Sequence, residues 1–388
     1  VGHTRAEFNY TDRFRSLIGK TSMSIREEVE HDFPHLPAGC NIVLEEKAKD
    51  YIVENIRRYL NNFSRAKLIS FIKNFEKDHD ASLSLSNFIR ITHIELAKIY
   101  KGGDATWAYY CERAGITNEL SQLNRVLGSA VYRKWFSTDS YSYFGFIIKL
   151  LKSKFRIKES ELNEEEKKMS LMLYYDLFQE AGMYYNIQDM FDALSEDDIL
   201  IKEMRELMPI LQNRCEANER RDISRKMNLL GSPLKLHATY TKDQILVGLS
   251  ASTIEKKSPS REGVLRIKDF GIEAMFVDII KDREEGSSTN YNDFAISDTI
   301  FNWETQNSVS QNTKTGQNYI NKRNTMLLFV RQQSSAPDDK NRTMGFVYLG
   351  EVELVDYSGN KPMQIKWRLK TPMPSSMLIY AKKHKIYG

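Results

Sequence analysis

The stretch YNDFAISDTIFNWETQN, residues 291–307, concentrates side chains that form hydrogen bonds or stack on flat rings. It holds four aromatic residues and neither Gly nor Pro. If its second half is a strand, side chains alternate between two faces. Phe301, Trp303 and Thr305 then share one face, which we expect to be core or the wall of a pocket. The opposite face is a polar row: Asn302, Glu304 and Gln306.

These residue types suit contact with a nucleobase. A carboxylate accepts a hydrogen bond from the cytosine amino group, and Asn or Gln pairs with base edges in both directions. Aromatic rings offer surfaces on which bases stack. Downstream, TKTGQNYINKR (residues 313–323) adds basic and amide side chains that suit phosphates and base edges. Gly316 within it would let the backbone approach a neighbour closely.

Catalytic chemistry has weaker support. Asp356, Gln364 and Lys366, around the predicted strand MQIKW, resemble a nuclease arrangement that holds a metal and polarises a phosphate. An exposed strand face explains the same residues, and we favour that interpretation. LIGKTS (residues 17–22) lacks a phosphate-binding loop's first glycine, because position 14 is Phe. We therefore expect no ATP site in this chain.

Length and composition indicate a folded, soluble protein of two or three domains. The chain has 388 residues, of which 41% are hydrophobic and 28% charged. No apolar run approaches the roughly 18 residues of a membrane span. The three cysteines, Cys40, Cys111 and Cys215, are odd in number and far apart, which fits a reducing cytoplasm without disulfides or zinc. The polar N-terminus lacks an initiator Met, so we expect a piece of a longer polypeptide.

The hydrophobic pattern predicts an α+β protein of two domains. Residues 1–222 show helical periodicity, as in SRAKLISFIKNFEKDH, where Leu68, Phe71, Ile72 and Phe75 share a face. Residues 223–388 contain many short strands with polar turns, which predicts an antiparallel barrel or curled sheet. Thr241 is the expected N-cap of a short helix. The predicted strands are GVLRIKD, EAMFVDII, AISDTIFNWETQ, TMLLFVRQQ, TMGFVYLGEVELVDY and MQIKWRLKTP.

Charge divides along the same boundary. Residues 223–388 contain 24 Lys and Arg against 17 Asp and Glu, a net +7, so the total of +4 leaves −3 for residues 1–222. A polyanionic partner is expected to meet the basic half. A basic helix, SSMLIYAKKHKIYG, ends the chain.

Several stretches closely resemble a known family: LGSPLKLHATYTKDQIL, REGVLRI, YNDFAISDTIFNWETQNSVSQNTKTGQNYI and FVYLGEVELVDYSGNKPMQIKWRL. It is a C-terminal domain of formerly unknown function, appended to bacterial superfamily II helicases that often carry a phospholipase-D-type nuclease. The N-terminal half is similar to the helical segment behind the helicase motor. Some proteins of this architecture are type IV restriction enzymes, which cut DNA containing 5-methylcytosine or 5-hydroxymethylcytosine. The resemblance implies that ATP and Mg²⁺ act in the parent enzyme and that this chain alone holds no cofactor and is no enzyme.

The resemblance further implies that residues 1–222 are an all-helical coupling or spacer domain and residues 223–388 a DNA target-recognition domain. The latter is expected to be β-barrel-like, similar to SRA and PUA domains that bind modified bases, and to flip the cytosine out of the duplex. The expected partners are double-stranded DNA with modified cytosine and the upstream helicase and nuclease domains, in the cytoplasm. The alternatives are B3-like recognition of unmodified DNA and a protein-interaction or structural extension of a helicase.

The candidate contacts follow from side-chain chemistry. Two aromatics among Tyr291, Phe294, Trp303 and Tyr348 would stack on the base, and Asp293 or Glu304 would accept from its amino group. Phosphates would be held by Lys314 and Arg323 and by the C-terminal lysines Lys382, Lys383 and Lys385. The full set of predicted nucleic-acid contacts is Tyr291, Asp293, Phe294, Trp303, Glu304, Gln306, Asn307, Lys314, Gln317, Arg323, Tyr348 and Lys382.

Overall fold

The computed structural model describes residues 64–92, 94–215, 219–221, 224–259, 263–280 and 293–382. They form two compact units. The first takes its described residues from 64–136, Asp197–Arg214 and Pro337–Asp339; the second from Ser137–Glu196, Cys215–Ala336 and Lys340 onward. By compactness, residues 137–196 therefore group with the strands, whereas the domain boundary at residue 222 stays a prediction.

The first unit is helical. Its α-helices are α4 (Arg65–Asp78), α5 (Leu85–Thr92), α6 (Leu96–Ile99), α7 (Trp107–Arg113), α8 (Asn124–Arg133) and α12 (Asp198–Arg214). The predicted face of α4 is confirmed for Leu68, Ile72 and Phe75, which are buried, whereas Phe71 is exposed. The short helix α7 is held at its start by Glu203 of α12, which accepts from the backbone nitrogens of Trp107 and Ala108, each at 2.9 Å.

The second unit combines helices with a sheet. Its α-helices are α9 (Tyr141–Lys152), α10 (Glu164–Phe178), α11 (Ile187–Ser195), α13 (Arg225–Leu229), α14 (Lys242–Gly248), α15 (Lys314–Ile320) and α16 (Ser375–Ala381). The N-cap role of Thr241 is confirmed, because its side chain accepts from the backbone nitrogen of Gln244 and Gln244 bonds back to Thr241. Among the described residues of the chain, no helix is long and apolar enough to cross a membrane.

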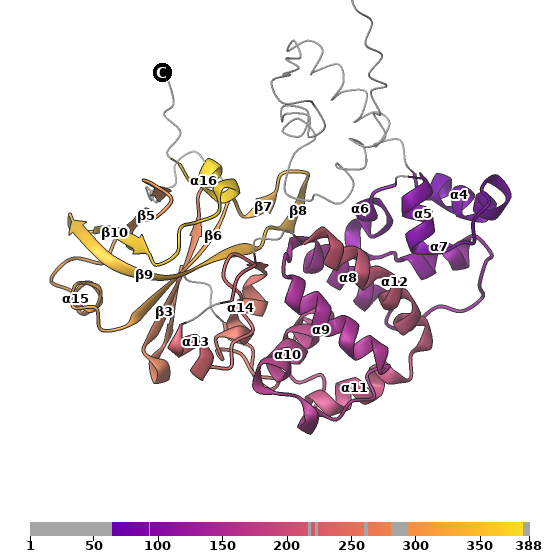
Figure 1. The fold of residues 1–388 in the computed structure, drawn as a ribbon, viewed down its shortest axis with the longest axis horizontal. Coiled ribbons are helices and arrows are strands. Elements are labelled where there is room, and N and C mark those ends of the chain that lie inside the picture. Colours follow the sequence, from indigo (N-terminus) through magenta and orange to yellow (C-terminus); the bar gives the residue numbers. More distant parts are fainter. Residues whose placement is uncertain are drawn as a thin grey trace, which may run out of the picture. The chain divides into compact units, whose positions relative to one another are not determined.

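The predicted α+β class is confirmed by a mixed eight-stranded sheet (Figure 1). Its strands are β1 (Thr239–Tyr240), β2 (Val264–Ile267), β3 (Ile272–Asp278), β4 (Phe294–Ala295), β5 (Ile300–Glu304), β6 (Thr325–Arg331), β9 (Phe346–Ser358) and β10 (Gln364–Leu369). The order is β2-β3-β6-β9-β10-β5-β4, with β1 also paired to β9. Strands β3 and β6 are parallel, and the other pairs are antiparallel. A separate pair, β7 (Ser335–Ala336) and β8 (Asp339–Thr343), occupies a predicted loop.

The expectation of a barrel is wrong, because the sheet is open. Among the described strands, β2 at one end pairs with β3 and β4 at the other end pairs with β5, and β2 and β4 do not pair with each other. Both are short, with four and two residues, and offer few hydrogen bonds for closure. Ala295 of β4 also forms an isolated bridge to Lys382, just after α16. Each face of an open sheet must be covered by other elements if it is apolar.

One face of the sheet packs against α15 and α16. Its core cluster joins strand residues such as Leu328, Ile365 and Trp367 to Tyr319 of α15 and Met377 of α16. The other face divides in two. Near β3, β6 and β9 it carries a buried aromatic stack, whereas β10 presents alternate exposed polar side chains, with a burial pattern that changes at every residue. The exposed half is the natural place for a polar surface.

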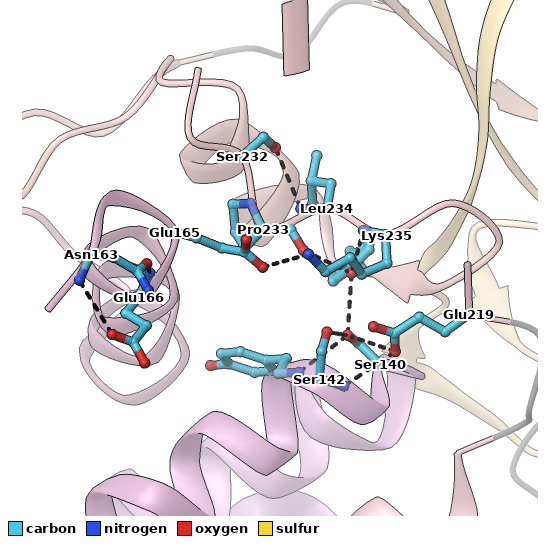
Figure 2. Close-up of polar contacts among 12 residues, drawn as sticks. Ser140, Ser142, Asn163, Glu165, Glu166, Glu219, Ser232, Pro233, Leu234 and Lys235 are labelled. Carbon is cyan, nitrogen blue, oxygen red and sulfur yellow. Dashed lines mark hydrogen bonds and ion pairs between the residues drawn. The ribbon is translucent and has the colours of Figure 1, made fainter. Parts of the chain in front are cut away.

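Polar contacts join α9 and α10 to residues 230–250, the segment that includes β1 and α14 (Figure 2). Ser140, the N-cap of α9, shares a hydrogen bond with the hydroxyl of Tyr240 at 3.2 Å. Glu165 of α10 pairs with Lys235 at 2.5 Å. Deeper in the same region, buried Asp176 accepts from the Tyr143 hydroxyl at 2.7 Å and from Gln244 Nε2 at 2.8 Å.

Lys168 on α10 makes a further set of contacts with this segment. Its ammonium group donates to the backbone oxygens of Leu230 and Gly248 and, at 2.6 Å, to the hydroxyl of Ser250. Leu230 caps the C-terminus of α13 and Gly248 ends α14, where the helix dipole favours a cation. Burial nevertheless lowers the pKa of Lys168 to about 8.

This lowered pKa predicts a pH-dependent term in stability. Between about pH 8 and the ordinary lysine value near 10.4, the unfolded chain binds the proton more often than the folded chain. The free energy of unfolding of the wild type should therefore rise relative to Lys168→Met as the pH increases through this window. Thermal unfolding of both proteins at pH 7.5 to 10.5 measures the difference.

Lys168→Arg is the matched control, because a guanidinium group keeps its charge throughout this range. The difference in the free energy of unfolding between Lys168→Arg and Lys168→Met should not change with pH. If the difference between the wild type and Lys168→Met were equally independent of pH, Lys168 would titrate normally in the folded protein.

Candidate nucleic-acid interface

The residues predicted to contact nucleic acid lie in several places in the second unit. Asp293, Phe294 and Glu304 are half-buried and lie at β4 and the end of β5. The region from the end of β5 to the turn after α15 carries Gln306, Asn307, Lys314, Gln317 and Arg323. Buried positions are taken by Trp303 and Tyr348. Lys382 follows α16, and Tyr291, Lys383 and Lys385 lie outside the described residues.

The two predicted carboxylates, Asp293 and Glu304, form hydrogen bonds with neighbouring strands. Asp293 Oδ1 accepts from the backbone nitrogen of Glu304 at 2.8 Å. Glu304 Oε1 accepts from Gln364 Nε2, across β5 and β10, at 3.1 Å. These bonds help to hold the strands together at this edge. A contact of either carboxylate with a cytosine amino group stays a prediction.

The aromatic candidates divide between the two faces of the sheet. Trp303 belongs to the core cluster below α15, where its ring lies 5.6 Å from that of Tyr319. Tyr348 is fully buried on the opposite face and stacks on Phe329 at 4.7 Å. In this structure Trp303 and Tyr348 therefore cannot stack on both sides of one base. Phe294 is half-buried opposite Asn302 and stays the accessible aromatic candidate among the described residues.

The nuclease-like residues form cross-strand pairs on the exposed face. Lys366 Nζ lies 2.8 Å from Asp356 Oδ2, and its hydrogen bond and charge lower the pKa of that carboxyl group. Gln364 points instead to Glu304. Among the residues that the structure describes, no three His, Cys, Asp or Glu side chains form a group suited to a metal ion. The exposure of Lys366 and Asp356 agrees with the interpretation as an exposed strand face.

The remaining candidates gather at one end of the sheet, in a surface that we call the amide tip. It consists of residues 305–324 and 358–362, which flank the end of β5 and the start of β10 (Figure 1). Thr305 and Met363 join the two segments, with the Thr305 nitrogen donating to the Met363 oxygen at 3.0 Å. The Met363 nitrogen donates in return to the Thr305 hydroxyl at 2.9 Å.

The amide tip contains no acidic residue. Residues 305–324 hold eight Asn or Gln side chains and three cations, and residues 358–362 add one amide and one lysine. The cations are all exposed: Lys314, Lys322, Arg323 and Lys361. In the same unit, the exposed lysines Lys366 and Lys370 pair with carboxylates, Asp356 at 2.8 Å and Glu351 at 2.9 Å. The tip is therefore a positively charged surface rich in groups that both donate and accept hydrogen bonds.

A chain of hydrogen bonds orders the amides. Asn321 Nδ2 donates to Gln317 Oε1 at 3.0 Å, and Gln317 Nε2 donates to the backbone oxygen of Gln311 at 2.6 Å. The Gln311 nitrogen donates to Asn360 Oδ1 at 3.0 Å, while its side chain donates to the Gly359 oxygen at the same distance. These bonds fix amide orientations that would otherwise rotate freely on an exposed surface.

Helix α15 seats the tip on the core. The close backbone approach expected at Gly316 is confirmed, but its partner is the protein's own chain. A Cβ atom there would overlap the carbonyl oxygen of Ser310 and lie 2.9 Å from the sulfur of Met363. One turn on, Tyr319 packs edge-on against Trp303 and Trp367, with ring centres 5.6 and 6.3 Å away.

An ion pair between the partly exposed Arg266 and the buried Glu273 holds the same helix from the side of β2 and β3. Glu273 is almost fully buried and accepts from Arg266 Nε at 3.1 Å and from Asn324 Nδ2 at 2.7 Å. Arg266 also donates to the Thr315 hydroxyl of α15 at 3.1 Å. Burial raises the pKa of Tyr319 beside this pair to about 12, so its hydroxyl stays protonated at neutral pH.

The predicted set missed part of this surface. Gln311, Asn321 and Asn360 belong to the amide chain, and Lys361 adds a cation, yet none of the four was among the predicted contacts. The signal in the sequence was the complete lack of Asp and Glu over residues 305–324 and 358–366. Hydrophobic periodicity does not detect such a lack, because it weighs apolar positions only.

Comparison with known proteins covers part of this unit. Residues 234–381 match the family model described as a domain of unknown function, DUF3427, so the sheet with α14, α15 and α16 forms a DUF3427 domain. No curated protein matches the chain. The expected C-terminal domain of formerly unknown function is thereby confirmed at residues 234–381, whereas its association with a helicase and a nuclease stays a prediction.

The close contact of α15 with the Ser310 backbone leads to a testable prediction at Gly316. In an ordinary helix Gly→Ala stabilises by about 0.5–1 kcal/mol. Here the added methyl group overlaps backbone, so Gly316→Ala should instead lower the free energy of unfolding by about 1–3 kcal/mol. Thermal unfolding of the full chain measures the change.

Gly263→Ala is the matched control, because its nearest neighbour would be the Phe276 oxygen at 3.7 Å. Its effect should stay within about 0.5 kcal/mol. A Gly316→Ala protein as stable as the control would mean that α15 does not lie against Ser310.

Proposed function

We propose that the DUF3427 domain recognises DNA in an ATP-dependent restriction enzyme that acts on DNA containing 5-methylcytosine or 5-hydroxymethylcytosine. The observation that carries the proposal is the amide tip, which combines four exposed cations with nine amides and no acid. Cations bind phosphates without regard to sequence, whereas Asn and Gln contact base edges. A surface with both properties suits a nucleic acid better than a protein partner.

The restriction-enzyme context comes from the family resemblance. In that architecture a phospholipase-D-type nuclease and a superfamily II helicase precede the helical segment and the C-terminal domain. ATP and Mg²⁺ would act in those upstream parts. The chain described here would contribute recognition and would itself catalyse no reaction.

Direct binding tests the proposal. The full chain is titrated with two 30-base-pair duplexes of one sequence, one carrying 5-methylcytosine at every cytosine and one unmodified. We expect the modified duplex to bind more tightly. Equal affinities would contradict recognition of the modification, and no binding to either duplex at 50 mM salt would contradict DNA recognition altogether.

The cations of the tip should account for the salt dependence. Lys314→Ala and Arg323→Ala should each weaken binding to both duplexes and lower the slope of log K against log salt by about 1, which is one phosphate contact. Lys152→Ala, on the exposed side of α9, is the matched control and should leave the slope unchanged. Unchanged slopes in the two tip variants would place the phosphate contacts elsewhere.

A further inference from the structure

Helix α15 has two distinct faces. Gly316 and Tyr319 are buried against the sheet, whereas Lys314, Gln317 and Asn321 are exposed. The exposed residues follow at spacings of three and four, so they lie along one side of the helix and its last turn. That side ends in the exposed cations Lys322 and Arg323 of the following turn, and no carboxylate belongs to the segment.

The outward amides are held in defined orientations. Gln317 sits between Asn321, from which it accepts, and the Gln311 carbonyl, to which it donates. Each of these bonds uses one hydrogen of a side-chain NH₂ group, which carries two, and an amide oxygen accepts up to two hydrogen bonds. Gln317 and Asn321 therefore retain donor and acceptor capacity toward the exposed side.

The inner face makes the helix a rigid support. Tyr319 is locked between Trp303 and Trp367, and Thr315 receives a hydrogen bond from Arg266, whose partner Glu273 is buried. A polar group contacts a base edge selectively only when its position is fixed to a fraction of an ångström. The structure supplies that rigidity beneath the amides.

We infer that α15 is a recognition helix that enters the major groove of duplex DNA, where Gln317 and Asn321 hydrogen-bond base edges. The inference rests on the proposed DNA recognition and specifies how it is done. The charge of the tip complements DNA, and the major groove, about 12 Å wide, admits an α-helix. Gln311 and Asn360 are positioning residues, because their hydrogen bonds to one another and to Gln317 hold the chain of amides in place.

This mode has a consequence for modified cytosine. The C5 position of a pyrimidine lies in the major groove, as the thymine methyl group does. A helix in that groove therefore meets the methyl group of 5-methylcytosine while the base stays stacked. Recognition by α15 requires no flipped base and no aromatic pocket, which agrees with the burial of Trp303 and Tyr348.

A selection experiment tests the inference with the full chain. Duplexes with twelve randomised base pairs, made with cytosine or with 5-methylcytosine, are bound at 100 mM salt, and the bound fraction is sequenced. Because Gln and Asn pair with adenine in this groove, the wild type should enrich adenine at two positions, each discriminated roughly 5- to 150-fold. Gln317→Ala and Asn321→Ala should each abolish one enrichment, while affinity for the unselected pool at low salt stays within about twofold.

Gln317→Glu keeps the size of the side chain and provides a gain of specificity. A carboxylate accepts from the cytosine amino group, so the preference at the affected position should change from adenine to cytosine. Asn360→Ala should blur the preferences at both positions and leave the salt slope unchanged. Lys152→Ala is again the matched control and should enrich the same sequences as the wild type.

Chemical footprinting gives an independent measurement. Dimethyl sulfate modifies guanine N7, in the major groove, and adenine N3, in the minor groove, and the wild type should protect the former at the selected site. Wild-type binding with unchanged enrichment in Gln317→Ala, Asn321→Ala and Gln317→Glu would overturn the inference and leave DNA recognition standing. Protection confined to adenine N3 would overturn it too. If the wild type bound no duplex at all, the proposed function itself would fail.

Discussion

The amide tip depends on the close approach of α15 to the chain that precedes it. Gly316 allows the helix backbone to lie against the Ser310 carbonyl, and Tyr319 then reaches the two tryptophans of the core. A larger residue at position 316 would lift the helix and withdraw Tyr319. With α15 in place, the Gln317 side chain donates to the backbone oxygen of Gln311, and the backbone nitrogen of Gln311 in turn donates to Asn360. The orientation of an exposed polar surface is thus fixed by a contact beneath it.

The local sequence pattern predicted much of the fold. Alternation placed Phe301 and Trp303 together in the core, and the residues around Thr241 specified a helix start with both bonds of its capping box. The sequence did not predict that the sheet is open. Closure depends on whether β2 and β4 pair with each other, and the sequence of neither strand determines that. Helix α15 was missed as well. Its composition of Thr, Gly, Gln and Asn favours helix weakly, and tertiary contacts with the core outweigh that preference.

The candidate site shows the same division. Residue types indicated a nucleic-acid surface near residues 313–323, and in the structure Gln311 connects Gln317 of that stretch to the 358–362 turn. Types alone did not tell which aromatic side chains are covered, since a strand face is equally apolar over a pocket and over a helix. Trp303 lies under α15, and Tyr348 stacks on Phe329 on the other side of the sheet. Which aromatic side chains are covered depends on how the elements pack in the folded unit, and alternation along one strand gives no information about that packing.

The hydrogen bonds of Asp176 reach across the start of the DUF3427 domain. Gln244 lies inside the matched residues 234–381, whereas Asp176 and Tyr143 lie before them. A gene fusion that transferred only the matched residues to another protein would leave behind the buried carboxylate that Gln244 contacts. Such a transplanted domain would also lack the surface that α10 provides for α14. A segment that keeps these contacts when it is moved to another protein must therefore be longer than the family match and include α9 and α10.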